Sequence, residues 1–416
     1  MTLDTAADRA VAADTAVVFM VVSNEQLEAA RTVAAHLPTR ATVVNPYTCT
    51  AIPLDELSRV ERPLGFIPTP RAIRNARITV RRALALAGGP SPVLVIGQDE
   101  GTMERVAVTA ARKAGARVAI MPDGVRATVP VVRHKAKKLS WKVISLADRT
   151  LVAAGILSGR RGDFGSSAPD AILGWGPGWE QPLQGRAPAA LVANCGNPRA
   201  DVFTEMPPRP HAWRILLCSQ PLSLPATAAP PREVAAWYAW LEAMDALGDP
   251  SVRVRLHPGE RSERYDLPAG LHHLRSEPPR TLAEDFAWSD VVISAYSSVL
   301  VEAVGASRVP ISAGATQIWG VYAANAFLED PRVPSVDFRT SLGVGDLLRV
   351  AAETEPHVDA LRDDYLANIG DAARQTADVI TALATVPVPV AAGRARRPRA
   401  EPCGRARPRL ARPQEG

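Results

Sequence analysis

Polar residues whose side chains could take part in catalysis or ligand binding follow five apolar stretches of the sequence. A carboxylate can remove a proton from a hydroxyl group, while serine and histidine can hold a phosphate. Five such ends in one chain favour a polar ligand site. They comprise Asp99 and Glu100 after residues 92–97, Asp123 after 117–121, Ser219 and Gln220 ending 214–219, His257 and Pro258 after 251–256, and Ser297 and Ser298 after 290–294.

Two of these ends offer a general base. Asp123 lies in a Pro-Asp-Gly triplet, which is also a common turn without any function. As a catalytic group, it would be a carboxylate held at a strand end and able to deprotonate a hydroxyl nucleophile. Asp99 and Glu100 stand one strand earlier and are the second candidate. The residues alone leave both open.

The other ends suit a phosphate. Ser297 and Ser298 open a predicted helix, and capping needs only one of them. Two hydroxyls beside free helical N–H groups would also bind an anion. Glu302, one turn later, could accept ribose hydroxyls or offset the helix dipole. His257 precedes a proline, which holds its backbone extended next to Arg255, although a lone histidine is often merely structural.

Metal and dinucleotide chemistry are disfavoured by what the sequence lacks. No His, Cys or Asp cluster has metal-ligand spacing, no Gly-x-Gly-x-x-Gly follows a strand, and no Walker loop is present. The four cysteines, Cys49, Cys195, Cys218 and Cys403, are far apart and suggest neither a zinc site nor a disulfide framework. We therefore expect no metal and no cofactor, in a reducing cytoplasm.

Continuous apolar strands alternate with amphipathic helices, which is typical of a parallel sheet covered on both faces. The pattern runs from residue 16 to 121, restarts at 214 and continues to 312. It predicts an α/β protein of two doubly wound, Rossmann-like domains facing a central cleft at the carboxyl ends of their strands. The proline-rich segment 49–72 is expected to be loop. Further strands are expected at 16–22, 41–44 and 309–312, and helices at 71–87, 102–114, 231–247, 281–288, 298–306 and 356–385.

The predicted domain limits follow from these patterns. They are a loose N-terminus at 1–14, a first domain at 15–185 that supplies the base, a second domain at 186–350 that binds the donor, a helical segment at 351–386, and a disordered tail at 387–416.

Length and charge agree with a soluble two-domain protein. The chain has 416 residues, no long uncharged apolar run and no basic, apolar leader. Its net charge of +5 comes from the tail at 387–416, which holds eight Arg and two Glu. Four of the five lysines lie in 133–142. This basic segment is either a solvated helix or a site for an acidic acceptor or an anionic membrane surface.

At these positions the chain resembles the glycosyltransferases called GT-B. More narrowly it resembles the bacterial sialyltransferase and polysialyltransferase families, which carry acidic-acidic-Gly, His-Pro and Ser-Ser/Thr motifs in that order. The counterparts here are Pro122-Asp123-Gly124, His257-Pro258 and Ser297-Ser298, with Pro122 replacing the first acid. The segment GNPRAD (196–201) is similar to one in the CDP-glycerol polymer transferases. These pieces span residues 16 to about 312.

The resemblance implies an inverting, metal-independent transfer from a nucleotide-linked donor, CMP- or CDP-linked, to a glycan or other hydroxyl acceptor. Asp123 would be the base, with Asp99 and Glu100 as the alternative. His257, Pro258, Arg255, Gln220, Ser297, Ser298 and Glu302 would form the donor side. No nucleic-acid partner is expected. The location would be the cytoplasm, with peripheral contact to the inner membrane face through 133–142 or the tail.

Other functions remain open on this sequence. A CDP-glycerol-type polyol-phosphate transferase would share the motifs, and a nucleotide-sugar epimerase would share the architecture without needing an acceptor. A non-catalytic nucleotide-sugar-binding protein is favoured by Pro122 in place of an acid.

Overall fold

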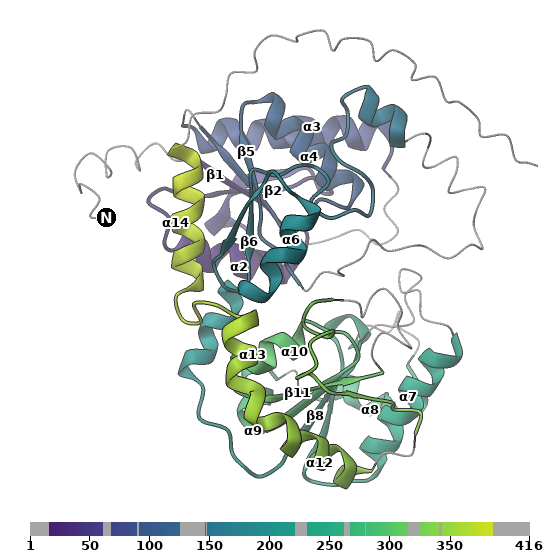
Figure 1. Ribbon diagram of the computed structural model, residues 1–416. Helices are drawn as coiled ribbons and strands as arrows, with labels where there is room; N and C mark the ends of the chain where they lie inside the picture. Colours follow the sequence, from purple (N-terminus) through teal and green to yellow (C-terminus); the bar gives the residue numbers. More distant parts are fainter. Residues whose placement is uncertain are drawn as a thin grey trace, which may run out of the picture.

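The computed structural model describes residues 16–60, 68–89, 91–124, 146, 148–220, 231–261, 267–278, 280–314, 325–340 and 343–385, and they form two α/β domains (Figure 1). The predictions for residues 1–14, for the basic segment 133–142 and for the tail 387–416 lie outside the described residues. Within the described part of the chain, no helix is both long and apolar enough to cross a bilayer.

The first domain is built on a seven-stranded sheet in the order β3-β2-β1-β4-β5-β6-β7. All neighbouring strands are parallel except β3, which runs antiparallel to β2 at the edge. The expected strands are present, and their residues are buried on both faces because helices cover the sheet on both sides. The strands are β1 (Val17–Met20), β2 (Thr42–Asn45), β3 (Thr50–Pro53), β4 (Val93–Ile96), β5 (Arg117–Ile120), β6 (Ala171–Gly174) and β7 (Leu191–Asn194).

Two pairs of helices cover this sheet. One face packs against α2 and the C-terminal helix α14, and the opposite face packs against α3 and α4. The bounds are α2 (Asn24–Ala34), α3 (Pro70–Ala87), α4 (Thr102–Lys113) and α14 (Ala372–Thr385).

Three strands differ from the sequence-based expectation. β3 lies inside the segment predicted as loop, and its Pro53 is tolerated because an edge strand does not need every N–H. β6 and β7 are additional to the expected strands, and they lie between Gly-rich and Pro-rich stretches. They are joined by the short helices η3 (Pro177–Trp179) and α6 (Glu180–Arg186).

The second domain contains a five-stranded parallel sheet in the order β12-β11-β10-β8-β9. Its strands are β8 (Ile215–Cys218), β9 (Val252–Arg255), β10 (Val291–Ser294), β11 (Val309–Ala313) and β12 (Ser335–Val336). Its helices include α7 (Pro231–Ala246), α8 (His273–Ser276), α9 (Leu282–Trp288), α10 (Val299–Gly305), α12 (Val344–Thr354) and α13 (Val358–Tyr365), with short turns η5 (Pro258–Arg261) and η6 (Ala269–Leu271). The strands and helices expected between 214 and 312 are confirmed.

Two predicted domain limits are wrong. The boundary at 185/186 would place β7 in the second domain, whereas β7 pairs with β6 in the first sheet. The segment 351–386 is not one helical unit. α13 packs on α10 of the second domain, while α14 returns to the first domain and contacts α2 (Figure 1). The chain therefore crosses between the domains twice, near η4 (Pro198–Glu205) and again near 366–371.

The segment GNPRAD joins the two crossings. Gly196 has φ +94°, and a Cβ there would lie 2.2 Å from the carbonyl oxygen of Ala367, so only glycine fits. The Asp201 carboxylate accepts hydrogen bonds from the backbone N–H groups of Gly370, Ala372 and Ala373 at 2.8–3.0 Å. These contacts cap α14 and fix the second crossing against the first.

Candidate functional site

A cleft of about 340 Å³ lies between the carboxyl ends of the two sheets. Both domains supply its walls, as the strand-end pattern predicted. Seven of the ten predicted site residues line it. The cleft residues are Ser23, Glu25, Asp123, Arg199, Cys218, Ser219, Arg255, Leu256, His257, Pro258, Leu282, Ser297, Ser298, Val299 and Glu302.

Asp123 is the carboxylate that the carboxyl end of β5 brings into the cleft. It is half-buried, and its Oδ2 accepts a hydrogen bond of 2.5 Å from the side-chain amide of Gln26 on α2. Glu25 from the same helix and Arg199 from η4 also line this side of the cleft. The first domain therefore presents a hydrogen-bonded carboxylate to the cleft.

The prediction of Asp99 as a candidate base is wrong. Its side chain is fully buried, with Oδ1 accepting the N–H of Gly165 at 2.8 Å and Oδ2 accepting that of Ser167 at 2.9 Å. Both oxygens thus hold a loop of the first domain rather than facing the cleft. Glu100 is half-buried and does not line the cleft either. A catalytic role for Glu100 stays a prediction that nothing in the geometry favours.

His257 follows β9, and its orientation is set by its own turn. The backbone N–H of Gly259 donates to Nδ1 at 3.1 Å, so the neutral ring carries its proton on Nε2. The backbone N–H of His257 donates to the buried carboxylate of Glu260 at 3.0 Å. Desolvation by the surrounding protein lowers the pKa of His257. The nearby carboxylate of Glu25 raises this pKa, and the charge of Arg255 lowers it. The ring is therefore a neutral hydrogen-bond donor.

The two serines after β10 differ in what they contact. Ser297 Oγ accepts the N–H of Val299 at 3.3 Å, which is the capping role that one serine alone can fill. The Ser298 hydroxyl makes no hydrogen bond to any residue that the structure describes, and it lines the cleft. Gln220 does not line the cleft. Its buried side chain accepts the N–H of Tyr296 at 3.1 Å and so positions the segment that carries both serines.

Glu302 and Arg199 form an ion pair across the join between η4 and α10. Arg199 Nη1 lies 3.7 Å from Glu302 Oε1, and the Glu302 side chain is almost fully buried. Burial raises the pKa of the Glu302 carboxyl, Arg199 opposes this, and the nearby carboxylates of Glu28 and Glu25 add to the rise. A buried carboxyl of this kind can accept or donate hydrogen bonds to a hydroxyl-bearing ligand.

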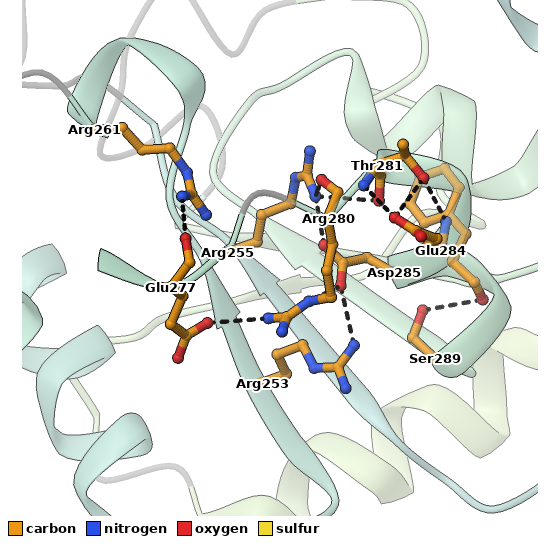
Figure 2. A network of polar contacts seen from close by, with 10 residues as sticks. Arg253, Arg255, Arg261, Glu277, Arg280, Thr281, Glu284, Asp285 and Ser289 are labelled. Carbon is orange, nitrogen blue, oxygen red and sulfur yellow. Dashed lines mark hydrogen bonds and ion pairs between the residues drawn. The ribbon is translucent and has the colours of Figure 1, made fainter. Parts of the chain in front are cut away.

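Arg255 belongs to a cluster of three arginines around one buried carboxylate. Figure 2 shows Arg253, Arg255 and Arg280 directed at Asp285. Arg253 and Arg280 each lie 3.0 Å from Asp285 Oδ1, and Arg255 contacts Oδ2. Arg280 also pairs with Glu277 at 3.2 Å. Arg255 therefore lines the cleft as a guanidinium group anchored to a buried carboxylate.

The described residues of the cleft offer neither a reactive thiol nor a cluster of metal ligands. Cys218 lines the cleft, but burial raises the pKa of its thiol to about 12, so it stays protonated at neutral pH and is no nucleophile. Within the described ranges, no three His, Cys, Asp or Glu side chains are grouped to hold a metal ion. The expectation of a metal-independent reaction stays a prediction.

Sequence reasoning missed three residues that line the cleft, and also Gln26, which contacts Asp123. Ser23 is a polar residue directly after the strand predicted at 16–22. The pattern of polar residues at strand ends, which located the other five sites, could therefore have found it. Glu25 and Gln26 lie in the first turn of the next helix and carry no signal of their own. Arg199 lies in GNPRAD. The resemblance of this segment to the CDP-glycerol polymer transferases assigns no role to its arginine.

Comparisons with known proteins give the fold class. No family model matches the sequence, and no curated protein matches it. Among solved structures, the wall teichoic acid polymerase TagF (H548A variant) aligns with TM-score 0.52 and 13% identity over 89% of each chain. A putative UDP-N-acetylglucosamine 2-epimerase from Listeria monocytogenes aligns with TM-score 0.51 and 10% identity, over 89% of this chain and 96% of that one.

At these identities the likeness concerns the fold alone. The expected architecture of two Rossmann-like domains facing a cleft, the GT-B fold, is confirmed. The narrower resemblance to sialyltransferases stays a prediction.

Proposed function

We propose that this chain is a glycosyltransferase that moves a sugar from a nucleotide-linked donor to a hydroxyl acceptor, with inversion and without a metal ion. One observation carries the proposal. A single cleft places the carboxylate of Asp123, from the first sheet, opposite the cation and hydroxyl donors that follow β9 and β10 of the second sheet. A glycosyl transfer needs a base for the acceptor and positive stabilisation for the departing phosphate, and the two walls supply one each.

The second domain would hold the nucleotide. His257 donates from Nε2, and Ser298 and Ser297 offer hydroxyls on the adjoining segment. Arg255 adds a guanidinium group. Pro258 favours an extended backbone at His257, the residue before it. Phosphate oxygens are strong acceptors for such donors, and charge on a leaving nucleotide increases their strength.

Glu302 would contact the ribose. Its carboxyl is buried in the cleft wall and held by Arg199, so the pair can offer both an acceptor and a cation to adjacent hydroxyl and phosphate groups. Gln220 acts at one remove, by fixing the segment that follows β10.

Asp123 would act as the base. It would take the proton from the acceptor hydroxyl as that oxygen attacks the anomeric carbon from the face opposite the nucleotide. The bond to the nucleotide phosphate breaks in the same step, and the negative charge passes to the phosphate on the second domain. One displacement inverts the anomeric configuration, and closure of the cleft brings the two halves together.

The donor would be linked to CMP or CDP and carry a sialic-acid-like sugar, and the acceptor would be a glycan or another hydroxyl compound. The sequence resemblance supports these assignments. Transfer of a polyol phosphate from a CDP-linked donor is the second candidate, and the presence of GNPRAD with Arg199 in the cleft favours it. We place the protein in the cytoplasm, where the basic segments 133–142 and 387–416 would contact an anionic membrane face.

The experiment has two steps. Thermal shifts with CMP, CDP, UDP and GDP identify the nucleotide, because a ligand that binds only the folded state stabilises it by mass action. Nucleotide release from the matching sugar donors is then measured with and without oligosaccharide acceptors, and with EDTA. Acceptor-dependent, EDTA-insensitive release is expected. A rearranged free sugar formed without acceptor would indicate an epimerase, and binding without turnover a non-catalytic protein.

A further inference from the structure

Gln26 is a buried amide placed between the backbone of β1 and the cleft. Its Oε1 accepts the N–H of Val22 at 2.8 Å, and its Nε2 donates to Asp123 Oδ2 at 2.5 Å. Only 5% of the residue is exposed. Because the backbone N–H must face an acceptor, the amide cannot rotate by half a turn without losing both contacts.

Gly97, at the carboxyl end of β4, makes room for this arrangement. A Cβ at this position would lie 2.4 Å from Gln26 Nε2, but 3.4 Å from Asp123 Cγ. Any larger residue would therefore displace the amide while leaving the carboxylate almost untouched. Three elements, α2, β4 and β5, thus fit together around one hydrogen bond.

The direction of this hydrogen bond fixes which oxygen of Asp123 receives it. An amide nitrogen can only donate, so Oδ2 is the acceptor and the carboxylate is held in one orientation. We propose that Gln26 is a positioning residue that holds the Asp123 carboxylate in a fixed orientation toward the cleft. This inference rests on the proposed function, in which Asp123 is the base.

Other charged groups from both domains line the cleft that Asp123 enters. Besides Asp123, the charged and titratable groups of the cleft are Glu25 on α2, Arg199 on η4, Cys218 on β8, Arg255 on β9, His257 after it, and Glu302 on α10. Gln26 donates to this carboxylate directly and carries no charge.

The contact can be tested without any substrate. The side-chain amide resonance of Gln26 is assigned in ¹⁵N-glutamine-labelled protein by its loss in Gln26→Met. Because the amide donates directly to Asp123, Asp123→Asn should move this resonance. A Gln26 resonance that does not respond to Asp123→Asn would overturn the inference.

The functional part uses a charge change with a matched control. Gln26→Glu puts a second carboxylate against Asp123, so the acid limb of the pH–rate profile should move up by about one pH unit or more. Gln375→Glu is the control, because Gln375 makes the same amide-to-carboxylate contact with Asp371, at 3.0 Å, on α14 away from the cleft. Its profile should match that of the native chain.

Two further variants separate position from charge. Gln26→Met removes the donor, and Gly97→Ala displaces it, so each should lower kcat on the order of 10- to 100-fold with KM nearly unchanged. Kinetics are measured with the donor found in the nucleotide screen. If Asp123→Asn is inactive while these variants and Gln26→Glu behave like the native chain, the inference fails and the proposed function stands. If Asp123→Asn is fully active, the proposed base fails regardless of what Gln26 does.

Discussion

Replacing Asp201 by alanine tests whether the second chain crossing is held as the structure indicates. The variant removes one carboxylate that receives three backbone N–H groups at the start of α14. Loss of a helix cap costs about 0.5–2 kcal/mol. Loss of a negative charge at a helix N-terminus adds about 0.3–1 kcal/mol. We therefore expect the free energy of unfolding to fall by about 1–3 kcal/mol.

The damage should be local. The inner face of α14 stays buried against the first domain through Ala373, Ala377 and Ile380, so the helix should remain docked while its first turn opens. Hydrogen exchange of residues 366–376 should accelerate more than exchange elsewhere in the first domain. Denaturant unfolding of the same protein gives the change in free energy.

Asp378→Ala is the matched control on the same helix. Asp378 pairs with Arg374 at 3.0 Å, and its side chain is 59% exposed. An exposed ion pair is worth about 0–1 kcal/mol, so this variant should behave almost like the native chain. If Asp201→Ala leaves both the unfolding curve and the exchange of 366–376 unchanged, the clamp has no energetic role and our interpretation of GNPRAD is refuted.

The remaining predictions concern the donor side of the cleft. His257→Ala, and separately the double change Ser297→Ala/Ser298→Ala, should each weaken nucleotide binding by roughly 10-fold or more, since each removes phosphate contacts worth about 1–3 kcal/mol. Calorimetry measures this, with the exposed Ser276→Ala as control, and unchanged affinity in both variants would remove the phosphate site from these residues. The lowered pKa of His257 also predicts a pH effect. Between that lowered value and 6.5 the unfolded chain binds the proton more readily, so the free energy of unfolding should fall as pH decreases through this window. His257→Gln should flatten this dependence in denaturant titrations, and an equally steep dependence in the variant would contradict the assignment.

The strands that could be predicted are those with continuous apolar residues and a polar end. β4, β5, β8 and β10 are of this kind, and the ends of β5, β8 and β10 meet in one cleft because parallel strands share a carboxyl edge. β6 and β7 lack such a signal. Their position in the first sheet depends on pairing with strands distant in sequence, and this moved the true domain boundary beyond Asn194.

The errors at the site have the same physical origin. Asp99 has the sequence context of a strand-end carboxylate, and only the loop at 165–167 folding over it reveals that its oxygens are engaged. Nothing in the local sequence around Gln26 indicates a partner 97 positions away. Local pattern therefore located the cleft, whereas the contacts inside it depend on long-range packing.

The central claim is the division of labour between the two walls of the cleft. Asp123→Asn keeps the shape of the side chain but cannot accept a proton. With the donor identified by the nucleotide screen, turnover should fall by at least about 100-fold, because general-base catalysis contributes about 10²–10⁴-fold.

Nucleotide affinity, measured by calorimetry on the same protein, should stay unchanged because the second domain holds the donor. The melting temperature of the variant must match that of the native chain, because Asp123 is part of the Pro-Asp-Gly turn and also accepts a hydrogen bond from Gln26. Full turnover by Asp123→Asn at native stability would contradict the account.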